Sequence, residues 1–598
     1  METKSHLSAW SWPQILALFV IPIGCVAPSQ SSGNVGQGGS SGVSGGKGGA
    51  GSGGTSASGG SAQGASGGNS GSGGTSAGDT SSGGGSAGRS GSKGGAGGAV
   101  EGGGSGSGGA VGSGGTAGGG GSGGPGGRAT TGGVGGGGAA GAAGAGGAGE
   151  GGVAGSGGTL STDCSITLSS GDVSPKMATV GVVEWSTTLS NLASAQIVYT
   201  LNNAGASILN KGGAAPVDLK KPNYHTLLLG LKPSSTYTFH VEATTSSGAA
   251  CKSADKTLST GALSGAPTIT RTATSPTGQA GGFIVTSTGQ GSGGFGTPSG
   301  SGSSGAFILD ADGTVVWYAA APSQCSRAHL DYEGANMWML ALNVQNSGGE
   351  MRFTSMDGAT SKTGISGLSG AHHDFTVMPG KIAAMVWSSS GTDPESNLVE
   401  MPSDGTGSVT TAFKIGSNLY AGGSSSFGGG SNTYHCNYII YHPADDSFTI
   451  SDRNPNLVVK VKHDGTPIWQ IGGSCTNAKA PKCAPGTWQV NHGHDFDGNG
   501  NMLLFNNGQS GSSHIFDFKV NETSTTIGFT TNKDFTSSNS SNVMGDVQYL
   551  PNGNRLITYS TAGVILEVDS SWTTVQTLKG SVGYADWRQT LYGPPTRK

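Results

Sequence analysis

The sequence has little charge and no excess of positive charge. Only 11% of its 598 residues are charged, and the formal net charge is −4. A protein that binds nucleic acid usually carries a basic patch or stripe, so this balance argues against that class of function. A length of 598 residues is far more than one hydrophobic core requires, and several domains are therefore expected.

Long hydrophobic runs are scarce, and the one near the N-terminus is short. It lies in METKSHLSAWSWPQILALFVIPIGCVAPSQ and spans about ten residues, from Ile15 to Gly24, too few to cross a bilayer. The step Gly24-Cys25 resembles a bacterial lipobox, with Pro22 where leucine is usual. We expect residues 1–25 to be a lipoprotein-type signal peptide, with a plain secretory signal as the alternative. The chain is then exported, to the outer membrane or cell surface, or otherwise to the periplasm or medium.

Cysteine is also rare, with seven in the chain. If Cys25 carries a lipid, an even number remains, which suggests disulfides in an oxidising compartment. Cys164 with Cys251 would tie the two ends of one small domain, and Cys475 with Cys483 would close a short loop. Elimination leaves the pair Cys325 and Cys436.

What the sequence has in excess is glycine, 118 residues, much of it in one block. Residues 26–159 are almost entirely Gly, Ser, Ala and Thr, with almost nothing to bury. We expect a disordered tether, whose root-mean-square span is on the order of 60 Å.

Short alternating strands follow in residues 160–262, for example ATVGVVEWST and STYTFHVEATT. Alternation with Gly, Ser and Pro turns predicts a β-sandwich, with Trp185 as a candidate core aromatic. The run LKPSSTYTFHVEATTSSG resembles the fibronectin type III signature, with Leu231, Pro233 and Tyr237 at its corner positions.

An internal repeat occupies residues 263–598. Six units recur at roughly 45 to 60 residues, each with a short apolar strand before a second strand and turn, as in MWMLALN followed by MRFTSMDG. About four short strands in each of six units predict a six-bladed β-propeller, with a long sandwich as the competing architecture.

Histidine recurs just upstream of these apolar strands. The segments that show the position are RAHLDYEG, HHDFTVMPG, HCNYIIYHPADD, HGHDFDGNG and GDVQYLPNG. The first strand of each propeller blade lines the central axis, so equivalent positions of successive blades face one another. We therefore expect these histidines to form one shared site.

Strand alternation predicts which side chains face the axis. His435 and Asn437 are two residues apart, as are His492 and His494, so each pair should project to one side. His372 and His373 should point to opposite sides. The match of HDF at 373–375 with HDF at 494–496 favours His373.

Three or four imidazoles would suit zinc or copper, but an arginine at the same place would not. Arg453 lies 18 residues after His435, and guanidinium is suited to an oxyanion such as phosphate or sulfate. The set fits transfer of a sulfuryl or phosphoryl group. One imidazole attacks, another protonates the leaving oxygen, and Arg453, Asn437 and a third histidine hold the oxygens.

The segments HHDF, HCNYIIYHPADDSFTISDRNPNLVVKVKHDGTPIWQIGG, HGHDFDGNGNMLLFNNG and GDVQYLPNGNRLITYSTAG resemble the bacterial arylsulfotransferase family. The resemblance implies a propeller that transfers a sulfuryl group from a phenyl sulfate to a phenol through a sulfated histidine, without a nucleotide donor or other cofactor. It implies roles for His435, Asn437 and Arg453, for His373 or His372, and for a nucleophile in HGH. Ungapped alignment favours His492 as the nucleophile, and the HDF repeat favours His494.

Two alternatives stay open: a non-catalytic propeller that binds a surface ligand, and a metal-dependent propeller enzyme. The run DFDGNGNMLLFN has Asp495, Asp497 and Asn499 at calcium-loop spacing, but Asn506 stands where the calcium loop needs glutamate. We interpret it as a hairpin turn. No metal, cofactor or nucleic acid is expected. A phenolic sulfate and a phenol are the expected partners, and the membrane only through a lipid on Cys25.

Overall fold

The computed structural model describes residues 165–289, 304–342, 349–389, 395–423, 434–508 and 511–596. The predicted signal peptide with Cys25, the predicted tether and Cys164 lie outside the described residues. The described ranges contain β-strands and two short 3-10 turns, η1 (Pro222–Tyr224) and η2 (Pro276–Gly278). In these ranges no helix has the length and apolar character to cross a membrane. The prediction of an all-β chain is confirmed.

Residues 165–260 form two antiparallel sheets. The strands, in spatial order, are β1 (Ile166–Val173), β2 (Gly181–Thr187) and β5 (Thr226–Leu228) in one sheet, and β4 (Gly212–Pro216), β3 (Leu192–Leu201), β6 (Thr236–Thr245) and β7 (Ala250–Lys252) in the other, where β8 (Lys256–Ser259) also pairs β6. Alternate residues of β6 are buried, as a half-buried strand requires. Trp185 is fully buried in the shared core, as predicted. The hydroxyl of Tyr237 accepts a hydrogen bond from the Lys232 amide at 2.8 Å.

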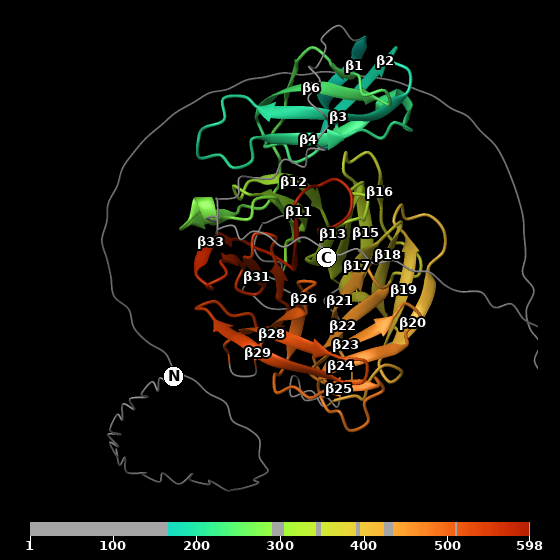
Figure 1. Cartoon of the computed structure of the whole chain (residues 1–598), viewed down its shortest axis with the longest axis vertical. Helices are drawn as coiled ribbons and strands as arrows, with labels where there is room; N and C mark the ends of the chain where they lie inside the picture. Colours follow the sequence, from blue (N-terminus) through green and yellow to red (C-terminus); the bar gives the residue numbers. More distant parts are fainter. Residues whose placement is uncertain are drawn as a thin grey trace, which may run out of the picture. The chain divides into compact units, whose positions relative to one another are not determined.

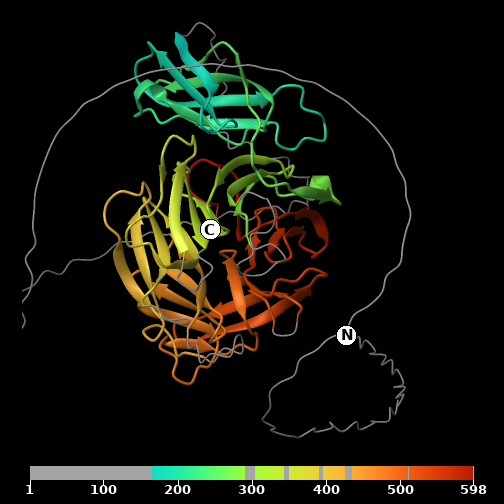
Figure 2. The same cartoon turned by 180° about the vertical axis from the view of Figure 1, so that it is seen from behind.

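Six antiparallel units of four strands each follow (Figures 1 and 2). The pair Gly349 and Ala371 joins the second and third units into one eight-stranded sheet. From the centre outward, the first unit has β34 (Ala585–Arg588), β10 (Phe283–Ser287), β11 (Gly305–Asp310) and β12 (Val315–Ala320), and the second has β13 (Cys325–Leu330), β14 (Asn336–Leu342), β15 (Gly349–Ser355) and β16 (Ser361–Lys362). The third unit has β17 (Ala371–Met378), β18 (Lys381–Trp387), β19 (Ser396–Pro402) and β20 (Thr410–Ile415), and the fourth has β21 (Cys436–His442), β22 (Ser447–Asp452), β23 (Leu457–Lys462) and β24 (Pro467–Gly472), with β25 (Lys482–Ala484) beyond. The fifth unit has β26 (Asn491–Phe496), β27 (Asn501–Asn506), β28 (His514–Glu522) and β29 (Ile527–Thr536), and the sixth has β30 (Asp546–Tyr549), β31 (Arg555–Tyr559), β32 (Val564–Val568) and β33 (Thr574–Lys579), with β9 (Thr270–Ala273) beyond.

The units close into a ring. Each inner strand contacts the next, from β13 through β17, β21, β26 and β30 to β34 and back to β13. A separate hydrophobic cluster fills each space between neighbouring units, including the space between the last unit and the first. The first unit takes its inner strand from the chain end, because β34 pairs with β10. Middle strands are therefore covered on both faces, which explains continuous apolar runs such as MWMLAL in β14.

The repeated aspartate of the HDF motif joins neighbouring inner strands. The Asp374 carboxylate accepts a hydrogen bond from the Ile439 amide at 3.0 Å, and the Asp495 carboxylate accepts one from the Tyr549 amide at 2.8 Å. Asp546, in the GDV segment, accepts the Ala585 amide at 3.0 Å in the same way. A carboxylate in this position satisfies an inner-strand amide that has no partner on that side. Strand joining therefore explains the repeated aspartate of the HDF motif.

The cysteines divide into bonded and free. Cys475 and Cys483 form a disulfide, as predicted. Cys251 is also disulfide-bonded, and its predicted partner Cys164 lies outside the described residues. The predicted bond between Cys325 and Cys436 is wrong, because both are buried and neither forms a disulfide. The two residues pack in different hydrophobic clusters, Cys325 between the first two units and Cys436 between the third and fourth.

Candidate active site

Four inner strands change register near their amino-terminal ends. The shifts lie between Cys325 and Arg327 in β13, Ala371 and Phe375 in β17, Cys436 and Tyr438 in β21, and Asn491 and His494 in β26. A bulge sets two residues opposite one and re-aims the side chains around it. Simple alternation therefore does not hold across these positions, and the expectation that His492 and His494 project to one side is wrong.

Three histidines from successive units meet at these bulges. The Nε2 atoms of His373 and His435 are 2.9 Å apart. Burial lowers the pKa of His373 well below its usual value, and the neighbouring imidazoles of His435 and His492 lower it further. His373 has a left-handed backbone, with φ of 57°, which is uncommon for a residue other than glycine. The turn of the backbone at this bulge brings its ring to the cluster.

His492 is held in one tautomer by a residue that the sequence did not mark. Asn507, just after β27, donates from Nδ2 to the carbonyls of Ser541 and Met544, each at 2.7 Å. Its Oδ1 therefore faces Nδ1 of His492 and can only accept, so Nδ1 carries the proton. Nε2 of His492 keeps its lone pair. Burial, and then the charge of Arg453, lowers the pKa of His492 to about 3.

His494 lies in different surroundings. It is fully buried, and its Nε2 is 2.8 Å from the Thr449 hydroxyl, on the second strand of the preceding unit. Its ring packs edge-on against Tyr438 and Phe496. These are contacts of a packed core, and they separate His494 from the cluster of His373, His435 and His492.

Arg453 is positioned by the residue before it. The Asp452 carboxylate accepts the amides of His435 at 2.8 Å and Asn454 at 3.0 Å, together with the Tyr420 hydroxyl at 2.8 Å. This fixes the end of β22 against the start of β21. Arg453 follows directly, half-buried, where its charge acts on both His373 and His492. A guanidinium here adds the positive charge that an oxyanion needs.

Asn437 joins two inner strands. It is fully buried, and its Nδ2 donates to the Asn491 carbonyl at 2.8 Å. Within the described ranges its Oδ1 accepts no hydrogen bond. One of its two N–H groups therefore fixes the start of β26, directly before His492.

A buried ion cluster of Arg327, Asp374 and Asp546 joins the inner strands β13, β17 and β30. Arg327 has no exposed surface and lies 3.0 Å from Asp374 and 2.9 Å from Asp546. Its guanidinium carbon lies 5.2 Å and 5.4 Å from the ring centres of Tyr438 and Tyr584. The sequence does not mark Arg327 as a central residue, because its partners Asp374 and Asp546 come from other units.

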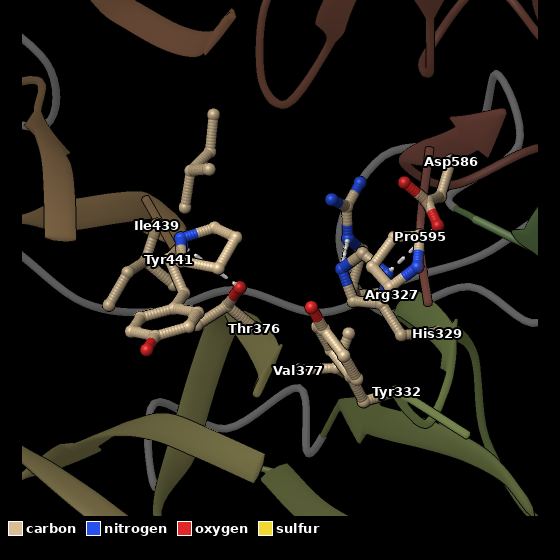
Figure 3. Close-up of a pocket in the computed structure, with 11 residues that line it drawn as sticks. Arg327, His329, Tyr332, Thr376, Val377, Ile439, Tyr441, Asp586 and Pro595 are labelled. Carbon is tan, nitrogen blue, oxygen red and sulfur yellow. Dashed lines mark hydrogen bonds and ion pairs between the residues drawn. The ribbon is translucent and has the colours of Figure 1, made fainter. Parts of the chain in front are cut away.

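A cavity of about 30 Å³ lies on the other side of this cluster (Figure 3). It is lined by the later residues of the same inner strands, with Arg327, His329 and Asp586 together on one side and Tyr441 on the other. A cavity that binds a benzene ring has a volume of about 150 Å³, so an aromatic ring does not fit here.

No group of His, Cys, Asp or Glu side chains within the described ranges is arranged to hold a metal ion. The cluster is instead three imidazoles beside one guanidinium. Neutral imidazoles offer a nucleophile and N–H donors, and the guanidinium offers charge to an anion. Such a set suits transfer of an anionic group to nitrogen.

A sequence model of the family described as arylsulfotransferase (ASST) matches residues 269–583, more than half of the chain. The chain belongs to the arylsulfotransferase family. All the histidines of the cluster, with Arg453 and Asn507, lie inside the matched range. The prediction of a sulfuryl-transfer enzyme is thereby confirmed, and the family implies phenolic sulfate substrates.

Solved structures of β-propeller proteins are also similar. TolB from Acinetobacter baumannii is 9% identical with a TM-score of 0.34, over 60% of this chain and 80% of that one. A putative 6-phosphogluconolactonase from Bacteroides fragilis is 10% identical with a TM-score of 0.34, over 52% and 98%. Virginiamycin B lyase from Staphylococcus aureus is 13% identical with a TM-score of 0.29, over 52% and 88%. Similarities of this size say nothing about chemistry. The chain matches none of the curated proteins with which it was compared.

Proposed function

We propose that the chain moves a sulfuryl group from a phenolic sulfate ester to a phenol through a sulfohistidine at His492, without a nucleotide donor. The main support for this proposal is the tautomer and the lowered pKa of His492. Its Nδ1 is paired with Asn507, its Nε2 keeps a lone pair, and its pKa is lowered to about 3 beside Arg453.

In the first half-reaction, Nε2 of His492 attacks sulfur. The bond between sulfur and the aryl oxygen breaks, and the electron pair leaves with the phenolate. Arg453 faces the sulfuryl oxygens, where charge is spread in the transition state. In the second half-reaction a phenol attacks the sulfohistidine and restores the free imidazole. Over both steps one proton passes from the acceptor phenol to the departing phenolate, and the pair His373 and His435 is placed to carry it.

The proposal is tested with the purified chain, p-nitrophenyl sulfate and a phenol, with no nucleotide present. Without a phenol, the release of nitrophenolate should stop at one equivalent per chain. With a phenol it should continue over many turnovers, with one equivalent of sulfated acceptor formed for each nitrophenolate. Failure to release nitrophenolate with a panel of phenols would refute the proposal.

The pH dependence of the first half-reaction follows from the lowered pKa of His492. An ordinary imidazole is protonated, and so loses its nucleophilic lone pair, as the pH falls through about 6.5. Because the pKa of His492 is lowered to about 3, its Nε2 stays unprotonated across that range. We expect the single-turnover rate of nitrophenol release, measured by rapid quench, to be flat between about pH 5 and pH 7. A decline with a midpoint near 6.5 would contradict this assignment.

We also propose that the six units form a six-bladed propeller and that the sandwich of residues 165–260 is a fibronectin type III-like module. The closed ring of inner strands supports the first. The order of strands in the two sheets and the hydrogen bond from Lys232 to Tyr237 support the second. An experimental structure with a different strand order would refute either part.

We propose further that the enzyme is exported and tethered through Cys25 and residues 26–159. The disulfide between Cys475 and Cys483, and the bonded state of Cys251, fit an oxidising compartment. Replacing Cys25 by serine should move the chain from the membrane fraction to the soluble fraction of the cell envelope. Retention in the membrane fraction, measured by immunoblot, would be evidence against lipid anchoring.

A further inference from the structure

A chain of hydrogen-bonded side chains runs from the third unit into the histidine cluster. Ser396, on β19, has its hydroxyl 2.7 Å from Nε2 of His372. Nδ1 of His372 lies 3.0 Å from Nδ1 of His373, and Nε2 of His373 lies 2.9 Å from Nε2 of His435. Every link between two imidazoles uses one N–H and one lone pair, so the tautomer of one ring determines the tautomer of the next.

His372 is held firmly in this chain. Its ring stacks on Trp387 with the ring centres 3.5 Å apart and the planes 6° apart. It is buried, with 3% of its surface exposed, while Trp387, at the end of β18, is half-buried. The stack and the Ser396 contact together fix the orientation of the His372 ring. His372 is one ring removed from His435, and it acts through His373.

Ser396 sets the direction in which the hydrogen bonds between these side chains are donated. The thiol of Cys436 donates to the Ser396 hydroxyl oxygen at 3.4 Å. The one hydrogen of Ser396 then has Nε2 of His372 as its acceptor among the described residues. His372 accordingly holds its proton on Nδ1 and donates to His373. His373 holds its proton on Nε2 and donates to His435, which leaves His435 with its proton on Nδ1.

We propose that His372, held by Trp387 and Ser396, is a positioning residue that fixes the tautomers of His373 and His435, so that Nδ1 of His435 is a hydrogen-bond donor in the active site. This rests on the proposed function for its catalytic meaning. A donor fixed before the substrate arrives needs no reorganisation when charge develops on the oxygens of the transferring group. The tautomers themselves are a property of the resting protein.

The test is nitrogen-15 NMR of the full chain with labelled histidine, which distinguishes a proton on Nδ1 from one on Nε2. Peaks are assigned by single substitution. We expect the wild type to show His435 protonated on Nδ1 and His373 on Nε2. His372→Phe keeps a ring on Trp387 but has no N–H, and His435 should then show both tautomers. His372→Gln, whose amide can donate to His373, should restore the single tautomer. A wild-type His435 protonated on Nε2, or an unchanged His435 in His372→Phe, would overturn the proposal.

Kinetics supply a second reading. In His372→Phe, kcat for phenyl sulfate should fall at least about tenfold with KM changed less than about twofold, since one preorganised donor is lost. The same substitution at His514, whose partner is Asp534 on an outer hairpin, is the matched control and should change neither constant. If the wild type transfers no sulfuryl group, the proposed function fails, and the NMR result still decides whether His372 sets the tautomers.

Discussion

Replacing His492 by alanine is expected to reduce sulfuryl transfer from p-nitrophenyl sulfate by at least about 1,000-fold, because the nucleophilic nitrogen is removed. The loss should fall on kcat, while the KM for the donor changes little, since Arg453 remains to bind its sulfate group. Initial rates of nitrophenolate release, with a saturating phenol, measure this effect.

The matched control is His494→Gln, two residues away on β26. His494 contacts Thr449 and the rings of Tyr438 and Phe496, and a glutamine can still bond Thr449. This variant should keep kcat within about tenfold of the wild type, because its amide preserves the one polar contact. If His494→Gln loses as much activity as His492→Ala while keeping its melting temperature, the assignment of the nucleophile is wrong.

Replacing Asp374 by alanine is expected to destabilise the ring by about 3–5 kcal/mol. The substitution takes the Asp374 carboxylate from the buried Arg327 and removes the acceptor of the Ile439 amide. Both groups are buried, so bulk solvent does not replace either loss in full. The urea midpoint, followed by tryptophan fluorescence, should fall sharply.

The control for this prediction is Asp404→Ala. Asp404 is exposed and accepts the Thr406 amide and hydroxyl within a surface turn. Its loss should move the urea midpoint far less, because water replaces the carboxylate. Equal shifts for the two variants would contradict the role given to Asp374.

The repeat of short strands and the recurrence of histidine were sufficient to predict an all-β repeat fold and the segments that hold the site. They were not sufficient to predict the directions in which the side chains point. Alternation fails where a bulge interrupts the strand, as at His492 and His494, and nothing in the local sequence marks a bulge. The HDF repeat led to the right residue for His373 but was misleading for His494, because the shared aspartates Asp374 and Asp495 serve to join inner strands.

Other features depend on contacts between distant parts of the chain. Asn507 is one polar residue in a turn until Ser541 and Met544 fix its amide. The strand that completes the first unit lies at the chain end and pairs across about 300 residues. The pairing of Cys325 with Cys436 was inferred by elimination, after the other cysteines had been assigned. Elimination gives no information about distance, and the two residues lie in different hydrophobic clusters between units.

The central claim is that His492 becomes sulfated, and a trapping experiment tests it most directly. The chain is mixed with p-nitrophenyl sulfate without an acceptor, quenched at alkaline pH and digested, and the peptides are sequenced by mass spectrometry. We predict one sulfuryl group on His492, released as sulfated product when a phenol is added before the quench. A sulfuryl group on His494 or on another residue, or turnover without any labelled histidine, would contradict the mechanism.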